Sequence, residues 1–285
     1  MSSKPRITIV GPGRLGTTLA VELGRAGYVV DEIIFRKSRA SLRKARALAR
    51  RTKARAILFS KARLSAGIIW FCVPDSEIAR AARALASRVD WAGKVAFHSS
   101  GALPSAELHV VKARGAAIAA VHPMMTFVRG ALPSLRGIPL AVEGDVTAVR
   151  SARNIVRALG GKLITVRTQD KTAYHAWGTL ASPLLLATLV TAEQVARAAG
   201  LSAFGARKQM LPIVRQTIEN YARLGPAAAF SGPIVRGDAE IVRQHLRMLN
   251  QVPNAREVYE ALARAALRYL PVRNRGRLKK VLSAD

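Results

Sequence analysis

The feature that most constrains the fold is a glycine-rich turn between a short apolar run and a helical repeat. Residues 7–10 are Ile-Thr-Ile-Val, which is typical of a buried strand, and residues 11–16 are Gly-Pro-Gly-Arg-Leu-Gly. Leu15, Leu19 and Leu23 then recur every four residues, the spacing of one helix face. A strand, a glycine-rich turn and a helix in this order predict the first unit of a doubly wound α/β sheet.

Strand and helix patterns continue to alternate over the first 166 residues. Further strands are expected at 29–35, 56–59, 67–73, 94–98, 116–121, 138–142 and 162–166. Several of these runs are separated by apolar residues at helical spacing. The alternation predicts an N-terminal Rossmann domain, with a parallel sheet that helices cover on both faces.

After Val166 the pattern is helical. Helices are expected near 170–199, 203–223, 238–250 and 255–269, and the basic tail 273–280 is expected to be mobile. The first helix is apolar on all sides after Trp177, which indicates burial in a bundle or at a dimer interface. We therefore expect two domains, at 1–167 and 168–285.

Composition narrows the class of protein. The single cysteine, Cys72, excludes a disulfide framework within the chain, so a cytoplasmic location is expected. No signal peptide is recognisable, and the apolar runs are shorter than the roughly 20 residues of a membrane span. No histidine or cysteine spacing typical of a metal site occurs. We therefore expect a cytoplasmic protein without a membrane segment or a metal.

The net charge of +29 predicts attraction to anions of every kind. Between Arg36 and Arg63 the chain has basic residues and no acid. A solvated helix face explains most of this run. Nucleic-acid binding is the weakest alternative, because aromatic residues make up only 5% of the chain and base stacking would need them.

The glycine-rich turn predicts a dinucleotide site. In such a turn Gly11 permits the tight bend, Gly13 lets the backbone approach a pyrophosphate, and Gly16 lets helix and strand pack closely. Arg14 and Leu15 open the helix, whose N-terminus offers free N–H groups to the pyrophosphate. A glycine-rich turn without a ligand is the alternative.

The end of the second expected strand decides between NADP(H) and NAD(H). An NAD site places Asp or Glu there to hold the ribose 2′-hydroxyl. This chain has Arg36, Lys37 and Ser38 instead, whereas Asp31 and Glu32 come too early. A guanidinium and a hydroxyl suit a 2′-phosphate, so we predict that NADP(H) is preferred over NAD(H). Ordinary surface charge is the alternative.

The fourth expected strand ends in Val73, Pro74 and Asp75. Ligands of open α/β sheets bind outside the carboxyl ends of the strands, so this turn is expected to border the cofactor. Asp75 is equally well placed to cap the helix that follows.

Histidines follow the next two strand ends. His98 precedes Ser99, Ser100 and Gly101, and His122 follows the sixth strand. Both clusters are expected at the edge of the sheet that holds the glycine-rich turn. His98 is therefore a candidate proton donor, and the other four are candidate substrate contacts. A structural hydrogen-bonding role is the alternative for each histidine.

A polar stripe opens the long helix. Lys171, His175, Gly178 and Ser182 are spaced 4, 3 and 4 residues apart and so share one face. Lys171 or His175 would protonate the oxygen or nitrogen formed when a C=O or C=N is reduced, and Ser182 would contact the substrate. In the structural alternative, Lys171 reaches solvent and His175 bonds a neighbouring carbonyl.

Residues 231–238, Ser-Gly-Pro-Ile-Val-Arg-Gly-Asp, break the helical region with a turn. Arg236 is a candidate for holding a substrate carboxylate. Asp238 is a second candidate in the substrate site, or it caps the following helix or pairs with Arg236.

Together these motifs resemble a bacterial family that joins a Rossmann-like domain to the domain of unknown function 2520. The likeness rests on the motifs at 11–16, 73–75, 98–102, 122–123, 174–176 and 232–238. The family looks related to pyrroline-5-carboxylate reductase and, more distantly, to 6-phosphogluconate and 3-hydroxyisobutyrate dehydrogenases. The resemblance implies an all-helical second domain like the C-terminal domain of 6-phosphogluconate dehydrogenase, NADP use and, often, a homodimer.

The distant dehydrogenases carry a catalytic Lys with an Asn four residues on. Lys171 fits that pattern, but His175 stands where the Asn would be, and closer relatives tend to read Ser-Asn where this chain reads Ser182-Pro183. The expected activity is NADP-dependent reduction or oxidation of a small carboxylate-bearing oxo acid, hydroxy acid or imine. An NADP(H)-binding regulator without chemistry is the main alternative, and a basic nucleic-acid-associated protein is the weaker one.

Overall fold

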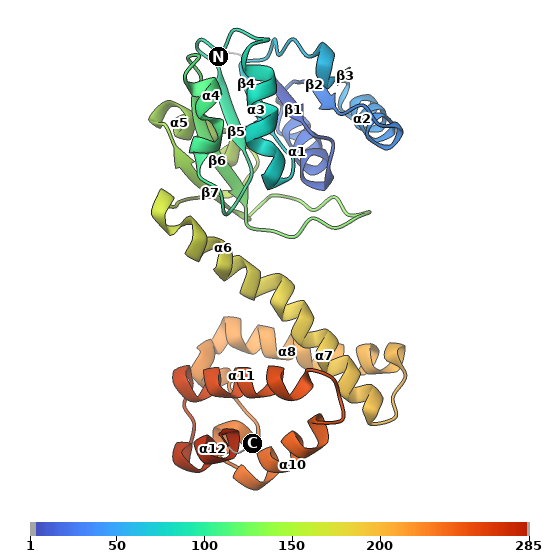
Figure 1. Cartoon of the computed structure of the whole chain (residues 1–285), viewed down its shortest axis with the longest axis vertical. Helices are drawn as coiled ribbons and strands as arrows, with labels where there is room; N and C mark the ends of the chain where they lie inside the picture. Colours follow the sequence, from blue (N-terminus) through green and yellow to red (C-terminus); the bar gives the residue numbers. More distant parts are fainter. Residues whose placement is uncertain (1–3, 284–285) are drawn as a thin grey trace. The chain divides into compact units, whose positions relative to one another are not determined.

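The computed structural model describes residues 4–283 and has two compact units that divide between Thr179 and Leu180 (Figure 1). The first unit holds the sheet and the second is helical. The functional division expected at 167/168 stays a prediction.

An eight-stranded sheet forms the first unit, in the order β3-β2-β1-β4-β5-β6-β7-β8. Its strands are β1 (Ile7–Val10), β2 (Val30–Phe35), β3 (Arg55–Leu58), β4 (Ile68–Phe71), β5 (Val95–His98), β6 (Ala117–Pro123), β7 (Pro139–Gly144) and β8 (Lys162–Thr165). The strand order reverses direction between β1 and β4, where α/β folds place their ligands. The predicted Rossmann sheet is confirmed.

One pairing departs from the all-parallel expectation, so β7 and β8 run opposite to the other strands. β7 pairs with β6 in the antiparallel sense, with Val121 opposite Val142. A parallel return needs a crossover, usually a helix, over one face of the sheet. Residues 124–138 between these strands contain no helix, so the chain turns back along its neighbour.

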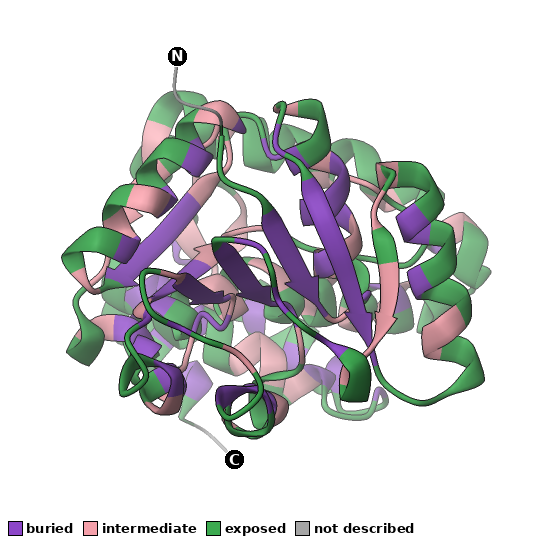
Figure 2. Ribbon diagram, turned by 90° about the horizontal axis from the view of Figure 1, so that it is seen from above, coloured by how far each residue is buried: buried purple, intermediate pink, exposed green. Residues whose placement is uncertain are grey.

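Helices cover both faces of this sheet, and the buried strands lie between them (Figure 2). The helices are α1 (Arg14–Arg25), α2 (Arg39–Thr52), α3 (Ile78–Ala86), the short α4 (His109–Lys112) and α5 (Val146–Ala158). Successive side chains of a strand point to opposite faces, so Trp70 packs in one core cluster and its neighbour Phe71 in the other. Full burial of such a side chain contributes about 1.5–3 kcal/mol, so the two clusters hold the strand ends in place.

Helices make up the rest of the described chain. They are α6 (Lys171–Thr179), the π-helical turn η5 (Leu180–Leu184), α7 (Leu185–Ala198), α8 (Ala203–Ala229), α9 (Pro233–Arg236), α10 (Ala239–Leu249), α11 (Ala255–Tyr269) and α12 (Arg275–Leu282). The expectation of a mobile tail is wrong. Residues 275–282 form α12, because Leu278, Val281 and Leu282 are buried in the core of the second unit.

Helices α7 and α8 of the second unit expose many large apolar side chains. They are Leu184, Leu185, Leu186, Val190, Phe204, Leu211, Ile213, Ile218, Tyr221 and Leu224, with Leu184 just before α7. By length and composition alone, the continuous helical segment Thr168–Ala198 would be able to cross a membrane, against our expectation from the sequence. The second unit does not bury this apolar helix as predicted. The exposed side chains are available for contact with another surface.

Candidate functional site

At two of the three glycine positions in the turn, nearby backbone atoms leave no room for a side chain, so only glycine fits. A Cβ on Gly11, which has a φ of +106°, would lie 2.5 Å from the Cys72 carbonyl oxygen. A Cβ on Gly16 would lie 2.1 Å from the Gly11 carbonyl oxygen. Gly13 is exposed, and its Cβ would meet nothing closer than the Cys72 oxygen at 3.8 Å. The space beside Gly13 is therefore available to a ligand.

A cavity of about 690 Å³ opens at the carboxyl ends of β1, β2 and β4. This volume lies within the usual 300–1,000 Å³ of small-molecule sites. Among its lining residues are seven that the sequence predicted for the cofactor, namely Gly11, Gly13, Arg36, Lys37, Ser38, Val73 and Pro74. The structure thus brings three separate predicted segments together around one cavity.

The start of α2 forms a basic corner of this cavity. Ser38 caps the helix by accepting a hydrogen bond from the Ser41 amide at 3.1 Å, which leaves its own hydroxyl hydrogen free to donate. Sequence reasoning missed Ser41, Lys44 and Arg80, which also line the cavity. The spacing of Ser38, Ser41 and Lys44 by three residues along one helix was the available signal. Glu77 is the acid among the lining residues, and it is paired with Arg80.

Asp31 and Glu32 are buried near the start of β2, at the opposite end of the strand from the cavity, and each pairs with an arginine. Asp31 accepts from Arg6 at 2.6 Å, and Glu32 accepts from Arg55 at 2.9 Å. Burial raises the pKa of Glu32, and the charge of Arg55 opposes this shift. Neither acid lines the cavity. The residues that follow Phe35 and line the cavity are the cations Arg36 and Lys37.

Three predicted cofactor residues direct their side chains to protein instead. Arg14 Nη1 donates to the Phe127 carbonyl at 3.1 Å, and Leu15 packs on the core. Asp75 accepts a hydrogen bond from the Ser100 hydroxyl at 2.7 Å. The capping alternative for Asp75 is wrong, because Glu77 occupies the N-cap of α3 and no side chain donates or accepts a capping hydrogen bond there.

Ser100 links three parts of the first unit. Its hydroxyl donates to Asp75 and accepts from the amides of Ala102 and Leu103 at 3.2 and 2.9 Å. Its carbonyl accepts from Lys171 Nζ at 3.4 Å. The loop after β5 is therefore fastened both to the end of β4 and to the start of α6.

His98 is fully buried, and both of its ring nitrogens are engaged. Nε2 donates to the Pro104 carbonyl at 3.0 Å, and Nδ1 accepts from the Ser100 amide at 3.1 Å. Burial lowers the pKa of His98 to about 4, so the ring is neutral at pH 7. The geometry offers no nitrogen to a substrate, so it supports the structural alternative over the predicted proton donor.

His122 lies in an aromatic cluster with the first turns of α6. Its Nδ1 is 2.9 Å from the Tyr174 hydroxyl, and its ring centroid is 6.3 Å from that of His175. Burial lowers the pKa of His122 to about 4 and raises that of Tyr174 to about 12. Gly101 packs against this ring, since a Cβ there would approach it to 2.9 Å. Ser99 instead accepts a hydrogen bond from Trp70 Nε1 at 2.8 Å.

Lys171 is 4% exposed, and its ammonium lies 3.8 Å from Glu143 Oε1. Burial lowers the pKa of Lys171, and the charges of Glu143 and Asp75 oppose this shift. Glu143 also accepts from the Ser105 hydroxyl at 3.0 Å. Sequence reasoning missed Glu143, although a carboxylate in the apolar strand Pro139–Gly144 is an unusual feature.

The predicted polar stripe of the long helix is only partly formed. Lys171 and Tyr174 are buried, whereas His175 is exposed. The α-helical register ends at the π-helical turn η5, which contains Pro183, so Ser182 does not continue the spacing. Gly178 remains in α6, with Met124 Cε 4.0 Å from where its Cβ would be.

Arg236 and Asp238 form an ion pair of 2.8 Å in the second unit. The pairing alternative for Asp238 is confirmed. Asp238 also occupies the N-cap position of α10, but its side chain makes no capping hydrogen bond. The substrate roles of both residues, like that of Ser182, stay predictions.

The sequence matches two family models. Residues 2–123 match a Rossmann-like domain, and residues 138–266 match a domain of unknown function, DUF2520. No curated protein matches the chain.

Solved structures share the fold at low sequence identity. BF3122 from Bacteroides fragilis is 22% identical with a TM-score of 0.78, over 92% of this chain and 98% of that one. A reductive aminase from Aspergillus terreus, in complex with NADPH and ethyl-5-oxohexanoate, is 17% identical with a TM-score of 0.67, over 97% and 99%. A pyrroline-5-carboxylate reductase from Coxiella burnetii is 16% identical with a TM-score of 0.57, over 98% of both chains.

Proposed function

Because this chain joins a Rossmann-like domain to a DUF2520 domain, we propose that it is an NADP(H)-dependent oxidoreductase. Its substrate is a small carboxylate-bearing oxo or hydroxy acid or an imine. The observation that carries the proposal is the cavity lined by Gly11, Gly13 and the basic corner at Arg36, Lys37 and Ser38.

The residues present fit NADP(H). The open space beside Gly13 and the N-terminus of α1 suit a pyrophosphate. Arg36 and Ser38 suit the 2′-phosphate, because a guanidinium binds phosphate bidentately and the Ser38 hydroxyl has a hydrogen to donate. When bound, NADPH supplies a hydride to a C=O or C=N carbon.

The reduced substrate atom then needs a proton. Lys171 and His175 are the proposed donors, and the contacts of the two differ. Lys171 is buried against Glu143 and Ser100, and its lowered pKa makes it a better acid than a solvated lysine. His175 is exposed beside the His122 and Tyr174 pair.

Substrate class is inferred from the solved structures that share the fold. The Aspergillus terreus protein is a reductive aminase, and the Coxiella burnetii protein is a pyrroline-5-carboxylate reductase, so both names point to C=N chemistry. Arg236 stays the candidate for a substrate carboxylate. An NADP(H)-binding regulator would share the cavity but would not turn over any substrate.

The direct test is a titration with NADPH and with NADH, followed by nicotinamide fluorescence at moderate salt. We expect binding with a clear preference for NADPH, and then NADPH oxidation with at least one member of a panel of 2-oxo acids and cyclic imines. Binding without turnover across the panel would support the regulator. Failure to bind either nucleotide would refute the oxidoreductase.

We also propose that two copies associate through the apolar faces of α7 and α8. Monomeric proteins rarely leave so many large apolar side chains exposed on two packed helices, and association of identical chains is the commonest way to cover them. Light scattering should give a dimer mass, and Leu186→Glu with Ile213→Glu should give a monomer. A monomer in the unaltered protein would overturn the dimer, and binding to lipid vesicles would support a membrane surface instead.

A further inference from the structure

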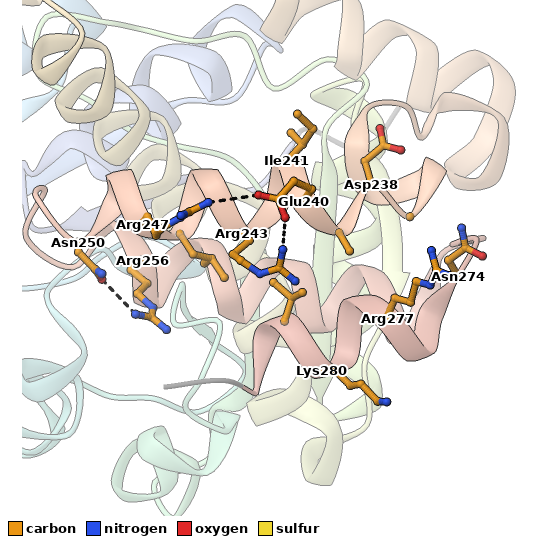
Figure 3. Close-up of a pocket in the computed structure, with 14 residues that line it drawn as sticks. Asp238, Glu240, Ile241, Arg243, Arg247, Asn250, Arg256, Asn274, Arg277 and Lys280 are labelled. Carbon is orange, nitrogen blue, oxygen red and sulfur yellow. Dashed lines mark hydrogen bonds and ion pairs between the residues drawn. The ribbon is translucent and has the colours of Figure 1, made fainter.

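A second cavity, of about 980 Å³, lies within the second unit among α10, α11 and α12 (Figure 3). Its lining includes five cations, Arg243, Arg247, Arg256, Arg277 and Lys280. Two carboxylates, Asp238 and Glu240, also line it. Positive charge is therefore concentrated on the walls of this cavity, whereas basic residues elsewhere are spread along the chain.

Both carboxylates are already engaged. Glu240 lies between Arg243 and Arg247, with an ion pair to each, and the Arg247 contact is 3.2 Å (Figure 3). Asp238 is paired with Arg236 at 2.8 Å. Neither acid is left to neutralise the cations that come from α12.

The guanidinium groups on the α10 and α11 side have carboxylate or amide partners that orient them. Glu240 orients Arg243 and Arg247, while Arg256 donates to Asn250 Oδ1 at 3.2 Å and to Glu260 at 2.7 Å. A group that is already oriented loses less side-chain entropy when a ligand binds. These arginines are therefore pre-arranged for bidentate contacts with an oxyanion.

The α12 side supplies the uncompensated charge. Arg277 and Lys280 lie three residues apart on one helix face and are exposed. Within residues 4–283 neither side chain is paired with a carboxylate. Their helix is fixed against α10 by the buried Leu278 and Val281, so the backbone holds both residues at this wall of the cavity.

The turn that forms one end of the cavity is also closely packed. Gly237 has a φ of +76°, and a Cβ there would lie 2.4 Å from the Arg273 carbonyl oxygen. The Arg273 amide donates to the Val235 carbonyl at 3.0 Å. This contact joins the segment before α10 to the segment before α12, so the two cationic walls keep their separation.

We propose that this cavity binds a small multivalent oxyanion, such as a compound with two or more phosphate groups. Several fixed cations around a hollow match a compact ligand with several charges better than an extended polyanion. The site lies wholly in the second unit and does not depend on the proposed oxidoreductase activity. It would give the protein a second anionic ligand beside NADP(H).

The probe for this site is inorganic tripolyphosphate, titrated calorimetrically into protein saturated with NADPH so that the cofactor cavity is filled. We expect one binding event that weakens as salt is raised. Arg277→Ala with Lys280→Ala should weaken it at least about tenfold, because two of the five cations are removed. Both side chains are exposed, so the variant should fold, which circular dichroism would check.

The matched control is Arg268→Ala with Lys279→Ala. It removes the same charge from exposed positions on α11 and α12 that do not line the cavity, and it should change the affinity less than about twofold. An equal loss in both variants would show diffuse attraction and would overturn the site. The absence of binding would also overturn the site, and so would tighter binding of a DNA duplex than of tripolyphosphate to the same residues.

Discussion

The ammonium of Lys171 lies 3.8 Å from Glu143 Oε1, and the two side chains are 6% and 7% exposed. This pair joins the first residue of α6 to the antiparallel strand β7. Removal of one partner from a buried ion pair leaves the other charge uncompensated, whereas removal of both partners costs less. The pair is therefore expected to fix the position of the lysine.

We expect Glu143→Gln to lower the free energy of unfolding at pH 7 by about 1–3 kcal/mol, because a neutral amide no longer balances the Lys171 charge. Lys171→Met in the same background should restore part of that loss. Urea unfolding of the two single variants and the double variant measures the coupling. Strict additivity of the two changes would show that the side chains do not interact.

The basic corner of the cofactor cavity should select NADPH through its 2′-phosphate. Arg36→Ala is expected to weaken NADPH binding about tenfold to a hundredfold, the range for loss of a charge-assisted hydrogen bond, with NADH affected less than about threefold. Fluorescence titration gives both constants. Arg50→Ala is the matched control, since Arg50 is exposed on α2 but does not line the cavity. A similar loss for both nucleotides would point to general electrostatic attraction.

Gly13 and Gly16 should respond differently to one added methyl group. Gly13→Ala has room within the protein, so its stability should be unchanged while NADPH binding falls at least about tenfold, because the methyl takes space beside the pyrophosphate. Gly16→Ala should lower the free energy of unfolding by about 1–3 kcal/mol, because the added methyl group clashes with the Gly11 oxygen. Thermal unfolding and titration separate the two effects. Normal NADPH binding by the Gly13 variant would contradict the assignment.

The two proposed proton donors can be separated by kinetics. If Lys171 donates the proton, Lys171→Met should lower kcat about 10²- to 10⁴-fold with little change in the Kd for NADPH, and His175→Gln should leave kcat nearly unchanged. The opposite pattern would assign the proton to His175. Unchanged turnover in both variants would exclude both roles.

His98 should make the protein less stable in mild acid. Its pKa is about 4 in the folded protein and 6.5 in the unfolded chain, so the unfolded state binds more protons between these values. Stability is then complete above pH 6.5 and falls as the pH drops toward 4, by at most about 3 kcal/mol for this group. Urea unfolding at pH 7 and pH 4.5 measures the loss. His98→Gln should show a smaller dependence, and an unaltered slope would mean that other groups cause it.

The sequence by itself determined the strands of the sheet, its first helix and the end of the sheet that holds the cofactor cavity. Strand and helix periods are local properties, so the spacing of Leu15, Leu19 and Leu23 was sufficient to predict α1 after the glycine-rich turn. The basic residues Arg36 and Lys37 follow β2 directly, so their position beside the turn follows from the parallel topology.

Tertiary structure alone decided the contacts around Ser100, His98 and Lys171. Lys171 meets Ser100 across 71 residues, and His122 meets Tyr174 across 52. No local period encodes which side chain reaches which across such separations, because that depends on how strands and helices pack. The same packing buries both nitrogens of His98 in hydrogen bonds and brings Glu143 to the lysine. A motif can therefore place a histidine or lysine at the edge of the sheet, but its surroundings decide whether it is free to exchange a proton.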